Sequence, residues 1–240
     1  KYPGAPEPPE LPPHVAFVNP LDWGVDGMSE LCASMLTWLF TIFLDPVNWD
    51  NAPWGLSGAI GDRMHVGGFR GLNGRLVDEA VQRSVVVRRP GVALLGPTVG
   101  AALAGSIDPY VRGLSGEPER SAAFLREHGI DPTGPVGELD AAQTAALVAA
   151  LRARLEGAGV LPEFVALLDQ ERWFLPSLGL DAEDLSNLQS ATGRAETPGI
   201  GVAMALGDDG AFERARRAET GWREGILKGL RRIERDGVHE

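Results

Sequence analysis

One carboxylate followed by a group of arginines is the part of this sequence best suited to chemistry. Asp62 ends an apolar segment, residues 54–60, and comes before a glycine-rich run. A lone acid at such a boundary is placed for chemistry. Arg63, Arg70 and Arg75 follow it, and planar guanidinium groups suit phosphate oxygens. These residue types in this order indicate a site for a phosphate-containing ligand.

Both features also have simpler explanations. Asp62 could be a solvated side chain at the end of a helix or strand, because one acid is not a constellation of catalytic groups. Six arginines stand against two acids between positions 63 and 89, a local charge of about +4, but arginines on an amphipathic helix are usually a solvated face. The shortage of lysine, found only at Lys1 and Lys228, can reflect genome composition. His65 is the one histidine close enough in sequence to Asp62 to contribute to the same site.

The elements expected to position Asp62 lie on both sides of it. Residues 28–44 repeat apolar side chains at helical spacing, and an Asp-Pro pair ends that helix. Residues 54–60 form either a strand or a short buried helix, which periodicity cannot decide over so few residues. Residues 72–86 predict a further helix, terminated by a Pro-Gly pair.

The rest of the chain also predicts helices. A Pro-rich start, residues 1–13, is expected to be extended or disordered, and residues 14–18 have the apolar run of a short strand. Residues 208–236 carry an apolar stripe at intervals of three and four residues, which predicts one long helix. Shorter helices are expected over residues 92–107, 118–128, 140–157, 162–175, 181–190 and 202–206. The predicted fold class is mainly α, with a short strand near residues 14–18 and a long C-terminal helix.

Composition limits the classes of protein that remain. With 240 residues, 44% of them hydrophobic, the chain can bury a sizeable core. No apolar run is long enough to span a membrane, and the Pro-rich start lacks the pattern of a secretory signal, which says little if residues precede it. Cys32 is the only cysteine, which excludes an internal disulfide and fits a reducing compartment, so we expect a cytoplasmic protein with no membrane partner. The net charge of −11 argues against a protein that binds nucleic acid over its whole surface.

Three segments taken together resemble a known family. Residues 17–20 place an Asn-Pro pair after a predicted strand, residues 29–34 open the next helix with serine and small residues, and residues 58–62 end an apolar segment in an aspartate. This order is similar to the fourth conserved region of the DHH-family phosphoesterases, in particular the archaeal RecJ-like exonucleases. Further segments resemble landmarks of the archaeal branch: residues 108–110, 113–116, 184–186, 193–194 and 207–208.

The resemblance implies a site, a substrate and a setting. Asp62 would be a ligand of a catalytic metal ion, Mn²⁺ or Mg²⁺, in a two-metal site within an α/β fold. Arg63, Arg70 and Arg75 would bind the phosphates of single-stranded DNA or RNA. The implied activity is that of a metal-dependent phosphodiesterase or single-strand-specific exonuclease in DNA repair or DNA replication, with replication proteins as further partners.

The sequence also departs from the family. Its first three motifs, including the Asp-His-His that gives the name, do not occur, and neither does the glycine- and histidine-rich signature of its C-terminal domain. We therefore expect an internal piece: an extended start at residues 1–13, the C-terminal part of the catalytic domain at 14–90, a helical middle region at 91–207 and a long connecting helix at 208–240. One carboxylate cannot assemble a two-metal site, so we expect this chain alone to be inactive.

Two other functions stay open. The first is a non-catalytic replication partner or scaffold of RecJ-like fold, in which residues 119–236 form a surface for docking other proteins. The second is a helical interaction domain unrelated to the family. The family's upstream motifs, if the intact gene carries them, would separate the metal-dependent exonuclease from both alternatives.

Overall fold

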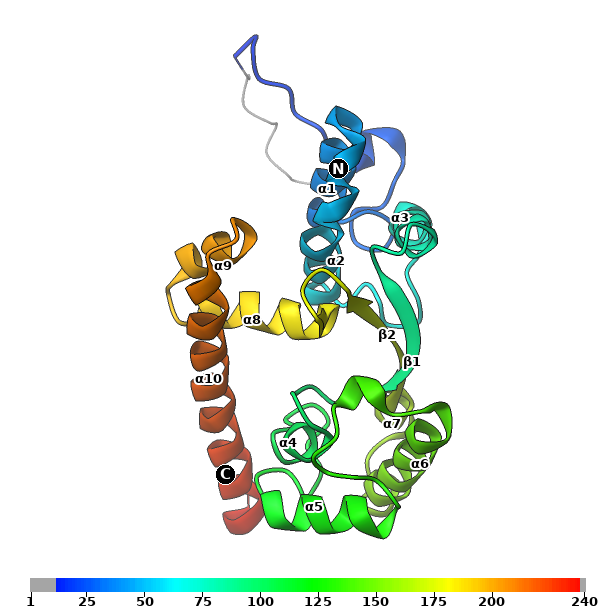
Figure 1. Ribbon diagram of the computed structural model, residues 1–240, viewed down its shortest axis with the longest axis vertical. Helices are drawn as coiled ribbons and strands as arrows, with labels where there is room; N and C mark the ends of the chain where they lie inside the picture. Colours follow the sequence, from blue (N-terminus) through cyan, green and yellow to red (C-terminus); the bar gives the residue numbers. More distant parts are fainter. Residues whose placement is uncertain (1–11, 238–240) are drawn as a thin grey trace. The chain divides into compact units, whose positions relative to one another are not determined.

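The computed structural model describes residues 12–237 of the chain (Figure 1). The chain forms two compact units, Lys1–Arg83 and Ser84–Glu240. It is 60% helical, with a small three-stranded antiparallel sheet and one long C-terminal helix, which confirms the predicted fold class. The prediction of an extended or disordered start falls mostly on residues 1–11, which lie outside the described residues.

The first unit is helical, and its two central helices approach each other closely. A Cβ atom added to Gly55 would lie 2.8 Å from the Cβ of Trp38, and one added to Gly58 would lie 2.5 Å from the Cβ of Ser34. The Ser34 hydroxyl donates to the Gly55 carbonyl at 2.9 Å across this contact. The elements of this unit are η1 (Pro20–Trp23), α1 (Ala33–Leu44), η2 (Pro46–Asn51), α2 (Ala52–Gly61) and α3 (Gly71–Gln82). The small residues of α2 therefore let it lie directly against α1.

The second unit contains the sheet and the remaining helices. Its strands are β1 (Val87–Val92), β2 (Asp169–Leu175) and β3 (Leu180–Asp181), in the antiparallel order β1-β2-β3. Val87 lies opposite Phe174, and Val92 lies opposite Asp169. The helices are α4 (Val99–Ala104), α5 (Pro118–Glu127), η3 (Val136–Glu138), α6 (Ala141–Gly157), α7 (Pro162–Val165), η4 (Ala166–Leu168), α8 (Ala182–Arg194), α9 (Pro198–Ala205) and α10 (Asp209–Asp236).

The core of the second unit forms where α6 meets the neighbouring helices and β1. Leu125, Leu147 and Leu151 are fully buried in it. Helix α6 begins with a reciprocal cap, because the Asp140 carboxylate accepts from the Gln143 amide at 2.7 Å and the Gln143 side chain accepts from the Asp140 amide at 3.1 Å. This cap satisfies two amide groups at the start of the helix and so fixes where α6 begins beneath β1.

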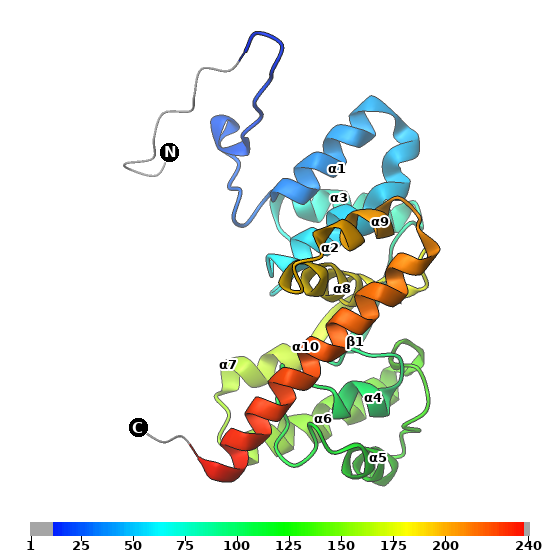
Figure 2. The same cartoon turned by 90° about the vertical axis from the view of Figure 1, so that its left-hand side faces the viewer.

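Helix α10 confirms the prediction of a long C-terminal helix. It packs against α8 and α9 and continues past them along the same unit (Figure 2). Ala215 is fully buried in this contact, whereas Ile233 near the other end is 51% exposed. Between them, Arg223 donates to the carbonyls of Leu95 at 3.2 Å and Gly105 at 3.3 Å. Neither α10 nor any other helix within residues 12–237 is long and apolar enough to cross a lipid bilayer.

Two local predictions are wrong. Residues 14–18 are turn and extended chain and do not form a strand, because no other backbone within residues 12–237 pairs with them. Residues 169–175, predicted as the end of a helix, form β2 instead. Its partner β1 lies far earlier in the chain, and local periodicity cannot report a partner at that distance.

Candidate functional site

Asp62 lies where α2 ends. Its amide donates to the Gly58 carbonyl at 3.1 Å. Its carboxylate is exposed and accepts no hydrogen bond from any other described residue. Upstream, α2 is almost wholly buried, with Leu56 at 1% and Ala59 at 0% exposure. The buried helix α2 therefore ends in the carboxylate of Asp62, which is exposed to solvent.

Arg63 closes α2 in a conformation that glycine usually supplies. Its φ is +59°, in the left-handed region. The Arg63 amide donates to Ile60 at 2.8 Å and the Met64 amide donates to Ala59 at 3.0 Å, the bond pair of a Schellman helix end. The Cβ of any residue except glycine is crowded in this conformation. Strained residues held in place by their surroundings cluster at functional sites. Ser84 and Glu196 also have a positive φ, but of the three only Arg63 directly follows a carboxylate, that of Asp62.

The loop after Arg63 is held in one path where it enters α3. Gly71 has a φ of +55°, and a Cβ added there would lie 2.6 Å from the Cβ of Glu30. The Asn73 amide donates to the Glu30 carbonyl at 2.8 Å. Arg70 immediately precedes this contact, so its backbone is fixed although its side chain is exposed.

The three arginines predicted to bind phosphate are all exposed on the first unit. Arg63, Arg70 and Arg75 each reach solvent. Arg70 and Arg75 form no ion pair with any described residue. The structure thus leaves the guanidinium groups of Arg70 and Arg75 accessible to an anionic ligand.

The other arginines of the basic segment have structural partners. Arg83 pairs with Glu79 at 2.8 Å and lies 4.6 Å above the Trp49 ring. Arg88 and Arg89 belong to β1 of the second unit, where Arg88 pairs with Glu171 at 3.7 Å and Arg89 with Asp181 at 3.2 Å. The local charge counted along the sequence is therefore divided between the two units.

His65 is buried, and the described side chains do not complete a metal site around Asp62. The His65 side chain is buried, at 8% exposure, with its ring centroid 6.4 Å from that of Phe69. Among the side chains that the structure describes, no three from His, Cys, Asp or Glu lie close enough together to hold a metal ion. Asp62 can serve as one ligand, and a complete metal site would need ligands beyond those in the described chain.

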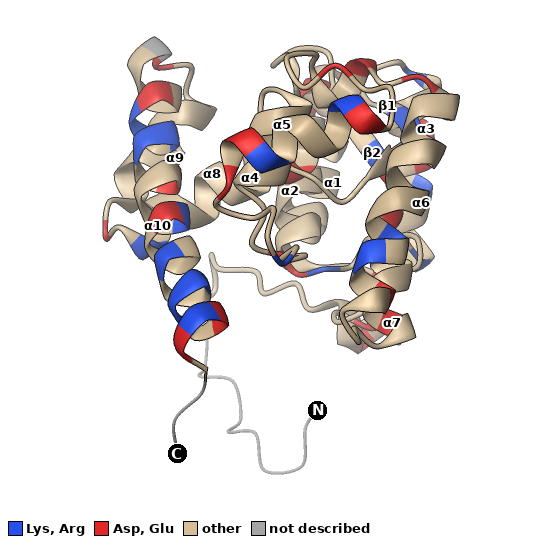
Figure 3. Ribbon diagram, turned by 90° about the horizontal axis from the view of Figure 1, so that it is seen from below, with Lys and Arg blue, Asp and Glu red and all other residues tan. Residues whose placement is uncertain are grey.

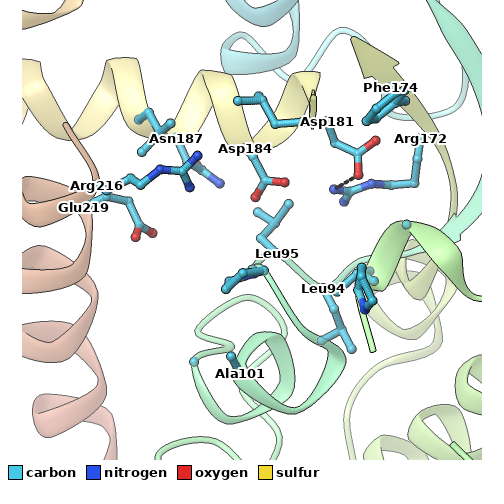
Figure 4. Close-up of a pocket in the computed structure, with 18 of the residues that line it drawn as sticks. Leu94, Leu95, Ala101, Arg172, Phe174, Asp181, Asp184, Asn187, Arg216 and Glu219 are labelled. Atoms are coloured by element: carbon cyan, nitrogen blue, oxygen red, sulfur yellow. Dashed lines mark hydrogen bonds and ion pairs between the residues drawn. The ribbon is translucent and has the colours of Figure 1, made fainter. Parts of the chain in front are cut away.

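The second unit contains a charged cavity of about 780 Å³ that the sequence did not reveal (Figure 4). Arg172 enters it from β2 and is only 4% exposed. Its guanidinium pairs with Asp181 at 3.3 Å and also with Glu183. A Cβ on Gly91 would lie 2.1 Å from the Arg172 Cγ, so glycine makes room for this side chain. Burial alone would lower the pKa of Arg172, but Glu183 and Asp181 raise it above its ordinary value.

Asp184 gives this cavity a second unusual group. Its carboxylate points into the cavity from the first turn of α8 (Figure 4) and accepts no hydrogen bond within the described part of the chain. Burial raises its pKa to about 6; Arg172 opposes this rise, and Asp181 adds to it. The Nε of Arg172 is buried and also has no partner among the described residues. The cavity can therefore bind a polar ligand, and Asp184 can exchange a proton near neutral pH.

Sequence reasoning missed this cavity for two reasons. Arg172 falls in the segment that was predicted to be helical, so its direction could not be known. Asp181, Glu183 and Asp184 form an acidic run at a helix start, which is an ordinary feature of helix N-termini. The only sequence signal was the resemblance of residues 184–186 to a family landmark.

Compared with known proteins, the chain matches no protein-family model and no curated protein.

Proposed function

We propose that the first unit supplies the Asp62 part of a metal-dependent phosphodiesterase that acts on single-stranded nucleic acid. The observation that carries the proposal is the end of α2, where an exposed carboxylate is followed by an arginine in a left-handed conformation. Strain of this kind persists only where the surrounding structure holds it. The resemblance to the DHH-family phosphoesterases supplies the class of reaction.

In this segment Asp62 would bind the metal ion, and the arginines that follow it would bind the phosphate. The Asp62 oxygens are hard donors that suit Mn²⁺ or Mg²⁺. When bound, such ions would supply an activated water and neutralise charge on the phosphate. Arg63, Arg70 and Arg75 would bind and orient the phosphate oxygens through their exposed guanidinium groups. Because the described residues contain no complete group of metal ligands, further ligands would come from other residues or another chain.

The compartment follows from the same proposal. Cys32 is a free, buried thiol, as is usual in the reducing cytoplasm. Replication or repair proteins would be the partners of this protein in the cytoplasm.

The proposal is tested by following where Mn²⁺ binds. Mn²⁺ is titrated into the ¹⁵N-labelled chain with a saturating single-stranded oligonucleotide, and the broadening of each amide signal is recorded. We expect residues 60–64 to broaden first, and Asp62→Asn to remove this effect. Asp50→Asn is the matched control, because Asp50 is also an exposed acid of the first unit.

Cleavage gives a second measure wherever the protein is obtained in an active form. Asp62→Asn should then reduce Mn²⁺-dependent shortening of the oligonucleotide by at least about 100-fold, with little change in thermal stability. Asp50→Asn should leave cleavage unchanged. Broadening spread evenly over acidic residues, or full activity of Asp62→Asn, would show that the site lies elsewhere.

A further inference from the structure

A second basic region lies on the second unit, in a groove of about 1270 Å³ between α10, α5 and the loops near them. Four of its cations come from one face of α10: Lys228, Arg231, Arg232 and Arg235. Their spacing of three, one and three residues places them on neighbouring turns. At 1.5 Å per residue they form a row about 10 Å long. Figure 3 shows Lys and Arg recurring along this end of the helix.

The opposite wall adds three more cations. Arg112 precedes α5, and Arg120 and Arg126 lie on that helix. The carboxylates that line the groove number three against seven cations. The groove is therefore strongly positive in a chain whose net charge is −11.

Ion pairing leaves three of the seven cations of the groove without a carboxylate partner among the described residues. Arg231 pairs with Glu117 and Arg112 with Glu234 at 3.4 Å, while Arg232 and Arg235 pair with Asp236 at 3.7 Å and 2.7 Å. Arg120, Arg126 and Lys228 form no ion pair with any residue that the structure describes. These three exposed cations are therefore available to an anionic ligand.

The floor of the groove indicates what kind of anion it binds. It is lined by glycines and alanines, and Gly116 lets the Arg231 side chain pass, since a Cβ there would lie 2.5 Å from Cδ of that arginine. Leu227 is the only large apolar residue that lines it, and no aromatic residue does within the described chain. Protein partners bind mainly through buried aromatic or aliphatic anchors. A phosphate backbone needs cations alone.

We propose that this groove binds the phosphate backbone of single-stranded nucleic acid without reading its bases. The inference rests on the proposed function for the class of substrate, but it uses no residue of the first unit. Because no aromatic side chain is available for stacking, affinity should come from counterion release and depend steeply on salt. An abasic strand should therefore bind as well as a strand with bases.

The test is fluorescence anisotropy with labelled oligo-dT, oligo-rU, an abasic strand and a duplex, from 50 to 200 mM salt without divalent cations. The groove variant is Arg120→Gln, Arg126→Gln and Lys228→Gln combined. The charge-matched control combines Arg152→Gln, Arg194→Gln and Arg217→Gln, which are exposed and line neither the groove nor the cavity around Arg172.

The groove variant should bind oligo-dT about tenfold more weakly at 50 mM salt. The slope of its log affinity against log salt concentration should be shallower by about 2, because each of the three lost phosphate contacts accounts for about 0.7. The control should lose less than half as much on both measures. Equal losses in the two variants, a preference for bases over the abasic strand, or tighter binding of the duplex would overturn the proposal. Competition by polyglutamate as strong as that by oligo-dT would assign the groove to an acidic protein instead.

These measurements distinguish a failure of the groove proposal from a failure of the Asp62 proposal. Asp62→Asn should bind oligo-dT normally when no divalent cation is present. The groove variant should keep the Mn²⁺ broadening of residues 60–64 once the oligonucleotide is again saturating. Loss of groove binding with that broadening intact therefore reports on the groove alone.

Discussion

Replacing Arg63 by glycine should make the first unit more stable and the protein a weaker binder of nucleic acid. Arg63 is held at a φ of +59°. This left-handed conformation costs a residue with a Cβ about 1–2 kcal/mol. Glycine removes that strain, but its greater freedom in the unfolded chain offsets about 0.4–1 kcal/mol of the gain. We expect a net stabilisation of about 0.5–1 kcal/mol.

Urea denaturation followed by tryptophan fluorescence measures the stability change, because Trp23, Trp38, Trp49 and Trp54 all lie in the first unit. The same variant should show a salt slope for oligonucleotide binding that is shallower by about 0.7, which corresponds to one lost phosphate contact.

The matched control is Glu196→Gly in the second unit, since Glu196 also has a positive φ, of +55°. Glu196→Gly should gain similar stability in its own unit without weakening binding. If Arg63→Gly lowers the urea midpoint, the strain argument is wrong. If it raises the midpoint but leaves the salt slope unchanged, Arg63 does not contact phosphate.

Two further predictions concern packing and pH. Gly58→Ala should destabilise the first unit by about 1–3 kcal/mol in urea, because its Cβ would overlap Ser34. Adding Ser34→Gly should recover only part of this loss, because it removes the overlap but also the hydrogen bond from Ser34 to the Gly55 carbonyl. Gly229→Ala, with nothing within 4 Å of the added atom, should instead stabilise α10 by about 0.5–1 kcal/mol. Because the folded pKa of Asp184 is raised from 3.8 to about 6, the folded state binds more protons than the unfolded state in this range, and stability should fall as pH rises from 4 to 6. Asp184→Asn should abolish this fall in stability and stabilise the protein at pH 7 by about 1–3 kcal/mol. Asp169→Asn, at an exposed position, should change neither the pH dependence nor the stability at pH 7. If Asp184→Asn left the pH dependence of stability unchanged, the raised pKa of Asp184 would be wrong.

Local sequence patterns predicted those features that depend on neighbours along the chain. The three- and four-residue stripe of residues 208–236 predicted α10. The same reasoning failed for β2, because a strand is defined by a partner and β1 is remote in sequence. Asp62 could be found from its position after an apolar segment, but the left-handed backbone of Arg63 could not, since arginine gives no sign of it.

The cavity and the groove depend even more on distant segments. Arg172, Asp184 and Arg223 come from β2, α8 and α10, and each carries an ordinary charge for its local element. Likewise Lys228 and Arg120 appear in sequence as solvated faces of two separate helices. Only the packing of α10 along the second unit places their charges in one groove.

The contact between Gly91 and Arg172 has a consequence for how this protein can change during evolution. Any side chain at position 91 would occupy the space of the Arg172 stem. A substitution there therefore requires a shorter residue at 172, which would remove the cation that the Asp181 and Glu183 carboxylates share, although Asp181 would keep its ion pair with Arg89. These four positions should be replaced together or not at all, so homologous sequences, once aligned, should show them covarying although they are spread over three strands and a helix.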